Sequence, residues 1–259
     1  MSQEVANKLW DAHKANVSID PIRSLLPEGD LTAAYAVQRA FNDKREADGQ
    51  RLIGRKSGFT NPTAMGMMEV DTPVSGLLYD VMDVPHRGEI PGAQITSAKI
   101  EAEIAFIMGA DLDFEKITMA DVMRATDYVT GAIEIVNTRI IDWSGKGVDM
   151  VSDNVGASHF TLGHKLQMLD QFDVSEAKAD IHVNGTSVGQ GAGANVLGSP
   201  LTSLCWLANQ MVAHGTPIQE GDVILSGSLG PMILVEKGDL VDVHIEGLGT
   251  TSVAFGKDL

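Results

Sequence analysis

Two glutamates, Glu101 and Glu103, alternate with apolar residues in the segment 99–106 (KIEAEIAF). If this segment is a strand, the two-residue period places both carboxylates on one face, about 7 Å apart. Like charges at this spacing repel each other, so one interpretation is a solvated sheet face from which both point outward. The other interpretation is a site for a hard divalent cation, which binds anionic oxygens that converge from one side.

A third carboxylate, Glu134, lies isolated in the apolar segment 132–136 (AIEIV). A glutamate buried among aliphatic residues is costly unless it has a partner. A cation already held by Glu101 and Glu103 would supply that partner. Three carboxylates without histidine or cysteine suit Mg²⁺ or Mn²⁺ better than Zn²⁺.

A lysine, Lys56, stands between Gly54 and Gly58 in the segment 54–60 (GRKSGFT). On composition alone, a solvated turn is the favoured interpretation of a lysine between glycines. A lysine beside a metal–carboxylate site would instead hold an anionic substrate or transfer a proton. Lys56 is therefore the candidate catalytic residue.

Two further segments are candidate substrate contacts. The segment 142–154 is polar and acidic, and it is either an ordinary surface loop or a loop in which Ser152 and Asn154 bind substrate. The segment 225–231 (LSGSLGP) contains Ser228 and Leu229. Its glycines allow backbone N–H groups to turn toward an oxyanion, although any tight turn uses the same residue types.

The elements that must position these residues differ along the chain. Residues 1–53 are expected to be helical: one helix spans 3–15, and a second spans 31–48 with Asp30 as N-cap and Gly49 after its end. Residues 54–259 form a mixed, strand-rich domain with helices beginning at Thr118 and Pro200. The strands are predicted at 73–79, 99–108, 128–136, 179–183, 223–225, 233–235 and 240–245, with a hairpin turn at Asn184-Gly185.

Composition narrows the class of protein. The chain has 259 residues, a formal net charge of −16 and one cysteine, Cys205. A strongly acidic chain argues against a nucleic-acid surface, and a single cysteine excludes an intrachain disulfide. No apolar run is long enough to span a membrane, and the N-terminal residues do not resemble a signal peptide, so a cytoplasmic protein is expected.

The chain resembles the 2-keto-4-pentenoate (2-hydroxypenta-2,4-dienoate) hydratase family of the fumarylacetoacetase-like superfamily. The resemblance covers nearly the whole chain, at segments 33–38, 54–56, 100–105, 138–143, 153–154, 221–232 and 244–249. It implies an α+β fold with a mixed β-roll core and higher homo-oligomers. It also implies that Glu101, Glu103 and Glu134 bind Mg²⁺ or Mn²⁺ and that Lys56 works at the substrate.

One position departs from the hydratase pattern. These hydratases usually carry an acidic residue where this chain has Val74, in the segment 72–76 (TPVSG). The related 4-oxalocrotonate decarboxylases have an apolar residue there, whereas the segments 142–143 and 227–232 favour the hydratases. With Val74 in place, proton transfer must use Lys56, bound water or another carboxylate such as Asp80.

The expected function is that of a metal-dependent hydratase in aromatic meta-cleavage catabolism. The metal would act as a Lewis acid on a small anionic dienoate, and water would add at C4 to give 4-hydroxy-2-oxopentanoate. One alternative is a 4-oxalocrotonate-type decarboxylase, and another is a non-catalytic subunit that stabilises an enzyme partner. A neighbouring pathway enzyme, either a decarboxylase or an aldolase, is a further expected partner.

Overall fold

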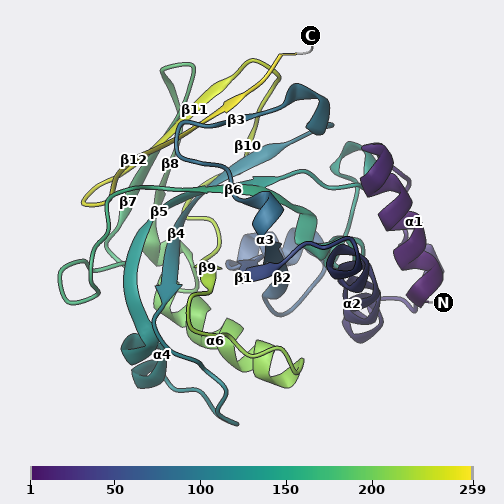
Figure 1. The fold of residues 1–259 in the computed structure, drawn as a ribbon, viewed down its shortest axis with the longest axis horizontal. Helices are drawn as coiled ribbons and strands as arrows, with labels where there is room; N and C mark the ends of the chain where they lie inside the picture. The colour runs from purple at the N-terminus through teal and green to yellow at the C-terminus, as the bar shows by residue number, and fades with distance from the viewer. Residues whose placement is uncertain (1, 258–259) are drawn as a thin grey trace.

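Two β-sheets form the centre of the computed structural model, which describes residues 2–257 (Figure 1). The larger, seven-stranded sheet has the order β2-β1-β9-β4-β5-β6, with β10 paired to β4, and the five-stranded sheet has the order β3-β12-β11-β7-β8. The strands are β1 (Leu52–Gly58), β2 (Val74–Tyr79), β3 (Glu89–Ile90), β4 (Lys99–Met108), β5 (Thr126–Val136), β6 (Ala157–Leu162), β7 (Lys178–Val183), β8 (Thr186–Ala192), β9 (Val223–Leu225), β10 (Ile233–Leu234), β11 (Leu240–Ile245) and β12 (Gly249–Phe255). The helices are α1 (Ser2–Ala15), α2 (Leu31–Ala47), α3 (Pro62–Met68), α4 (Met119–Ala125), α5 (Gly147–Ser152) and α6 (Pro200–Ala213).

The long antiparallel pair β4–β5 divides the molecule into two sides. Ile100, Ile104 and Ile133 point to one side, where they pack in the main core with residues of the five-stranded sheet and of α6. Strand alternation places Glu101 and Glu103 on the other side. Most strand pairs are antiparallel, but β1–β9 and β3–β12 are parallel. The predicted α+β class with a mixed sheet is therefore confirmed.

The two N-terminal helices lie together at one side of the molecule (Figure 1). As predicted, α2 begins after Asp30, whose carboxylate accepts a hydrogen bond from the Ala33 N–H at 3.0 Å. The apolar face of α2 buries Val37 and Phe41 in a second core, which also includes Val74 of β2 and Val151 of α5. The helices thus support the segments that flank Lys56.

Several local predictions also match the structure. Thr118 and Asp121 form the capping box that begins α4, and α6 starts at Pro200. The predicted strand at 99–108 has the bounds of β4. The short helices α3 and α5 and the strands β1, β3, β6 and β12 were not predicted. The interpretation of segment 54–60 as a turn is wrong. Residues 54–58 belong to β1, which lies between β2 and β9 in the larger sheet.

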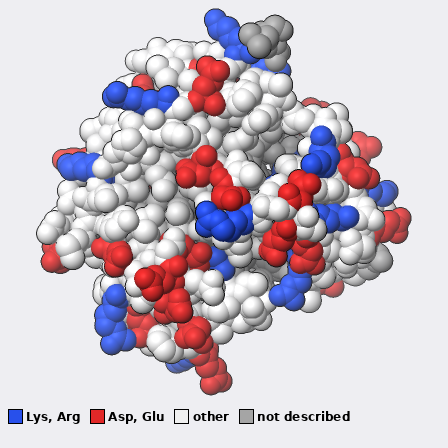
Figure 2. All heavy atoms as spheres, viewed as in Figure 1, with Lys and Arg blue, Asp and Glu red and all other residues white. Residues whose placement is uncertain are grey.

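The surface agrees with the acidic composition. On the face shown in Figure 2, basic side chains are interspersed among acidic ones rather than gathered in a large patch. Among residues 2–257, the helices are all too short or too polar to cross a bilayer.

Candidate metal centre with a buried lysine

Three glutamates converge on one face of the β4–β5 pair. The register places Glu101 of β4 directly opposite Glu134 of β5, while Glu103 stands opposite Ala132. Paired residues of antiparallel strands share a face, and residues two apart on one strand do so as well. One carboxylate oxygen from each glutamate lies within 4.8 Å of those of the other two. The structure therefore brings together the three side chains predicted as metal ligands.

These carboxylates are poorly satisfied by the protein itself. Glu103 and Glu134 are fully buried, and Glu103 Oε1 and Glu134 Oε2 have no hydrogen-bond partner among the described residues. Burial, followed by the charge of Glu134, raises the pKa of Glu101 to about 7 and raises the pKa of Glu103 well above its usual range. A divalent cation would supply the missing interactions and favour the charged form of each carboxylate. The donor set therefore fits a hard, oxygen-liganded metal ion.

Lys56 completes the cluster from the neighbouring part of the sheet. In β1 it pairs with Gly76 of β2 and with Leu225 of β9, and the residue is 1% exposed. Its Nζ lies 2.6 Å from Glu134 Oε1. Burial alone would lower the pKa of Lys56, but the charges of the three glutamates outweigh burial and raise it. Three carboxylates and one ammonium leave two negative charges, which a divalent cation would neutralise.

The glycines around Lys56 are required by close packing, not by a turn. A Cβ at Gly54 would overlap the backbone carbonyl oxygen of Val223, which lies on the adjacent strand β9. A Cβ at Gly58 would lie 2.7 Å from Val155 Cγ1. Both glycines therefore let neighbouring segments approach β1 closely, and this approach fixes Lys56 beside the glutamates.

The segment 225–231 turns a backbone N–H toward an anion, as its glycines suggested, but the anion belongs to the protein. The N–H of Gly227 donates to Glu103 Oε2 at 2.8 Å, and the φ of Gly227 is 100°. Ser228 forms a side-chain hydrogen bond that lowers the pKa of Glu101, against the larger effect of burial. Gly227 is thus a positioning residue that the sequence analysis missed, although the glycine-rich motif was the signal for it.

We expect Gly227→Ala to lower Mg²⁺ affinity by roughly 10- to 100-fold, the usual cost of disturbing a residue that orients a metal ligand. The added methyl group would overlap the side chain of Thr60, and the left-handed backbone would be strained. The N–H would then move away from Glu103. Isothermal titration with Mg²⁺ measures this effect. The control is Gly29→Ala, whose φ is also positive at 66° but whose Cβ would meet no atom within 4 Å. Equal Mg²⁺ affinities for wild type and Gly227→Ala would contradict the assigned role.

Two of the predicted substrate contacts have structural roles instead. The Asn154 amide bonds both backbone groups of Leu77, accepting from its N–H and donating to its carbonyl, each at 2.8 Å. The amide thus satisfies backbone groups at the edge of β2 that a neighbouring strand would otherwise bind. The Leu229 side chain is buried in the main core, and its N–H donates to the Ala102 carbonyl at 2.8 Å. Neither side chain is free to bind a substrate.

The remaining predicted residues lie in different surroundings. Ser152 is buried near the end of α5, and its hydroxyl has no hydrogen-bond partner among residues 2–257. Asp80 follows β2 at the end where Tyr79 pairs with Leu52, four residues along the strand from the Gly76–Lys56 pair. Its carboxylate binds Arg51 through the backbone N–H at 3.0 Å and the guanidinium at 3.8 Å. Asp80 is therefore not brought to the glutamate cluster.

Comparisons with known proteins show which family and fold this chain resembles. The family described as "Fumarylacetoacetate (FAA) hydrolase C-terminal" matches residues 71–255. The 2-keto-4-pentenoate hydratases of Paraburkholderia phymatum and Burkholderia vietnamiensis are both 39% identical to this chain. The matches cover 98% and 97% of this chain, and 97% and 96% of theirs. The structure of 4-oxalocrotonate decarboxylase from Pseudomonas putida G7, complexed with magnesium and adipate, is 31% identical with a TM-score of 0.94, over 98% of this chain and 97% of that one.

Proposed function

Since the chain belongs to the 2-keto-4-pentenoate hydratase family, with the fumarylacetoacetase-like fold, we propose that it is a metal-dependent hydro-lyase acting on 2-hydroxypenta-2,4-dienoate or a close analogue. The product would be the 4-hydroxy-2-oxo acid, formed within aromatic meta-cleavage catabolism. The observation that carries this proposal is the convergence of three buried or half-buried carboxylates with one buried lysine.

Glu101, Glu103 and Glu134 would hold Mg²⁺ or Mn²⁺. Two observations support them as ligands. One carboxylate oxygen from each glutamate lies within 4.8 Å of those of the other two, and Glu103 Oε1 and Glu134 Oε2 have no hydrogen-bond partner in the described part of the chain. When bound, the metal supplies Lewis-acid polarisation of the substrate's oxygen atoms and neutralises the charge of the glutamates. Glu101 is only partly buried, so a substrate would approach the cluster from its side.

Lys56 would carry the protons that the reaction moves. Hydration adds one hydrogen to C5, another to C3 and a hydroxyl to C4, while the enol hydroxyl loses its proton to become the 2-oxo group. A single ammonium can deliver a proton to the dienol carbon and recover one from the enol hydroxyl. Lys56 is placed for this role because Glu134 fixes its Nζ at the cluster and burial excludes competing water.

The finer features of this function are also proposals. A homo-oligomer, a cytoplasmic location and contact with the neighbouring decarboxylase or aldolase of the pathway all follow from the family resemblance. The division into a helical region at 1–53 and a catalytic domain at 54–259 is a proposal as well. Ser152 and Ser228 remain the candidate substrate contacts.

The second candidate function is decarboxylation of a 4-oxalocrotonate-type 2-oxo acid. Val74 favours it: this buried residue pairs with Gly58 and lies on the same sheet face as Lys56, where the hydratases usually have an acid. The similarity to a 4-oxalocrotonate decarboxylase structure favours it too. The relatives named as hydratases are more similar in sequence, at 39% against 31% identity, so hydration is the better-supported function.

One experiment separates these functions. The purified chain is incubated with 2-hydroxypenta-2,4-dienoate or with 4-oxalocrotonate, with and without Mg²⁺, while dienol absorbance and CO₂ release are recorded. We expect Mg²⁺-dependent loss of the dienol without CO₂. Release of CO₂ from 4-oxalocrotonate would indicate the decarboxylase. Lack of turnover of either compound would favour a non-catalytic subunit.

A further inference from the structure

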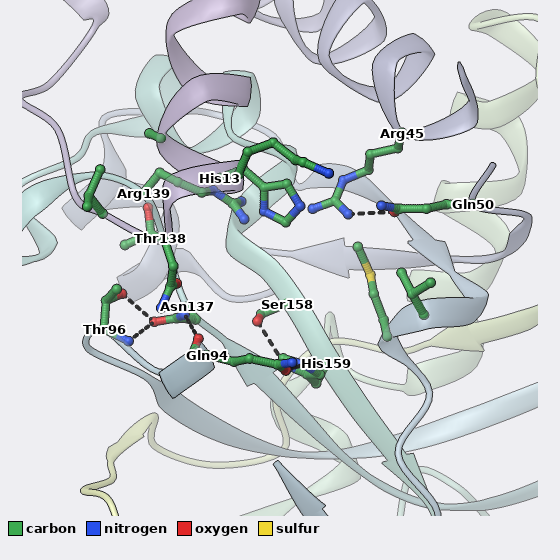
Figure 3. A pocket seen from close by; sticks show the side chains of 16 residues that line it. His13, Arg45, Gln50, Gln94, Thr96, Asn137, Thr138, Arg139, Ser158 and His159 are labelled. Carbon is green, nitrogen blue, oxygen red and sulfur yellow. Dashed lines mark hydrogen bonds between the residues drawn. The ribbon is translucent and has the colours of Figure 1, made fainter. Parts of the chain in front are cut away.

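A polar cavity lies between the N-terminal helices and the edge of the larger sheet (Figure 3). Its volume is about 330 Å³, and the four residues of the metal centre are not among those that line it. Its walls come from α1, the end of α2, the segments around Met82 and Gln94, the segment that follows β5, and β6. The polar lining consists of His13, Lys14, Asn16, Arg45, Gln50, Gln94, Thr96, Asn137, Thr138, Arg139, Ser158 and His159.

The charge of this lining is opposite to that of the protein. The chain carries a net charge of −16, yet the cavity is lined by three cationic residues and by no aspartate or glutamate. Two of the three cations have carboxylate partners outside the lining. Arg139 is paired with buried Asp153, and Lys14 lies 3.1 Å from Asp48 at the surface. The third cation, Arg45, has none.

Arg45 is a buried guanidinium without a counter-ion within salt-bridge distance among residues 2–257. It is 2% exposed, and its Nη1 donates to the Gln50 side chain at 2.8 Å, while its Nε has no partner. Its guanidinium lies 5.1 Å from the Phe41 ring centre and 5.6 Å from that of Tyr79. Burial, followed by the charge of Arg139, lowers its pKa to about 9. A cation removed from water in this way is stabilised strongly by an anion.

The two histidines of the cavity supply neutral hydrogen-bonding groups. The His13 ring stands beside the guanidinium groups of Arg45 and Arg139, while His159 lies on the opposite wall with Ser158 and Gln94 (Figure 3). Burial, reinforced by the nearby arginines, lowers the pKa of His13 to about 2, and burial with the charge of Arg45 lowers that of His159 to about 4. Both rings are therefore uncharged near neutral pH, and each can donate or accept a hydrogen bond.

We propose that this cavity binds a small dianionic oxyanion, such as phosphate or a short dicarboxylate, through Arg45 with Lys14 and Arg139. A planar guanidinium matches the oxygen spacing of carboxylates and phosphates, and a charge-assisted hydrogen bond would satisfy the free Nε of Arg45. The cavity is larger than either anion, so a phosphate or a short dicarboxylate would fit together with bridging water molecules. The neutral lining groups would complete the remaining hydrogen bonds.

Calorimetric titration of the metal-free wild-type chain tests this proposal. Phosphate and succinate are titrated separately, with sodium chloride at matched ionic strength as the reference, and the two arms distinguish a phosphate from a dicarboxylate. We expect saturable binding of at least one of them with Kd at or below about 1 mM. Absence of saturable binding of both anions would overturn the proposal without affecting the hydratase assignment.

Three substitutions test whether the anion binds in this cavity. We expect Arg45→Met to weaken it by about 10-fold or more, as the loss of a charge-assisted hydrogen bond implies, and Lys14→Met to weaken it by a smaller factor. Lys8→Met is the control, because it removes an exposed cation from the same helix outside the cavity. Circular dichroism checks the fold of each variant. Unchanged affinity in a folded Arg45→Met variant, or in Lys14→Met if Arg45→Met does not fold, would place the anion elsewhere and refute the proposal.

Discussion

Replacing Glu134 with glutamine is expected to lower both Mg²⁺ affinity and turnover by more than the roughly 10- to 100-fold that follows changes to residues orienting a metal ligand. Glutamine keeps the shape of the side chain and one carbonyl acceptor for Lys56, but it removes a negative charge from the centre of the cluster. Mg²⁺ would then have to bind to the carboxylates of Glu101 and Glu103 alone. The Lys56 ammonium beside them would also have lost its nearest counter-charge, because Glu134 Oε1 lies 2.6 Å from its Nζ in the wild type. The fold should persist, because the substitution changes no volume and the charges of Glu101 and Glu103 still act on the Lys56 ammonium.

Titration calorimetry with Mg²⁺ and the dienol assay measure the two effects of Glu134→Gln. Glu246→Gln is the matched control, since Glu246 is exposed and lies in the other sheet's hairpin between β11 and β12. A further readout is thermal unfolding: Mg²⁺ should raise the Tm of the wild type and of Glu246→Gln, but should raise that of Glu134→Gln much less. Full activity of Glu134→Gln in chelator-treated buffer would contradict the assignment of Glu134 as a metal ligand.

The carboxylate cluster shows what a sequence can predict and what it cannot. Period-2 alternation placed Glu101 and Glu103 on one face, and the structure agrees because β4 is a regular ten-residue strand. The isolation of Glu134 among aliphatic residues predicted that it needs a partner. The strand register that sets Glu134 opposite Glu101 could not be predicted, since it pairs residues that lie 33 positions apart in the sequence.

The surroundings of Lys56 and Asp80 also depend on long-range pairing, which the local sequence does not show. Glycines on both sides of Lys56 resemble a turn locally, but they are needed because neighbouring chain segments pack directly against β1. Asp80 follows a predicted strand, yet β2 runs antiparallel to β1 and carries Asp80 away from Lys56. The proposed boundary near residue 53 falls within β1, and the structure shows helices of the first region sharing a core with Val74 and Val151.

A polar residue with a structural role caused another error. Asn154 occurs in a polar segment that resembles a substrate-binding loop, but its side-chain amide bonds both backbone groups of Leu77 in β2. Nothing in the local sequence distinguishes an amide that completes a sheet edge from one that binds a ligand. The helix ends, by contrast, were predictable because N-capping is local: Asp30 and Thr118 bond to backbone groups three residues ahead.

Lys56→Arg is expected to keep substrate binding and to lose most turnover, about 10²-fold, a typical contribution of a general acid–base residue. Arginine retains the positive charge beside Glu134, so attraction of an anionic substrate and the charge balance of the cluster persist. It is effectively never deprotonated, so it cannot give up a proton to the dienol carbon and take one back. If Lys56 acts only through its charge, Lys56→Ala should mainly raise KM; if it transfers protons, Lys56→Ala should lower kcat.

Steady-state kinetics of wild type, Lys56→Ala and Lys56→Arg separate the two roles, with Lys178→Arg on the exposed surface of β7 as the control.

The guanidinium of Lys56→Arg is larger than the ammonium it replaces. It must fit a site where the residue is 1% exposed and the lysine Cγ packs against Gly76. Mg²⁺ titration of Lys56→Arg therefore accompanies the kinetics: an affinity close to that of the wild type shows that the three glutamates have kept their places, so a lower kcat then reports proton transfer. A wild-type kcat in Lys56→Arg would show that Lys56 is not the proton carrier. Water bound at the cluster or one of its carboxylates would then have to take that role, since Asp80 is held by Arg51 at the far end of β2.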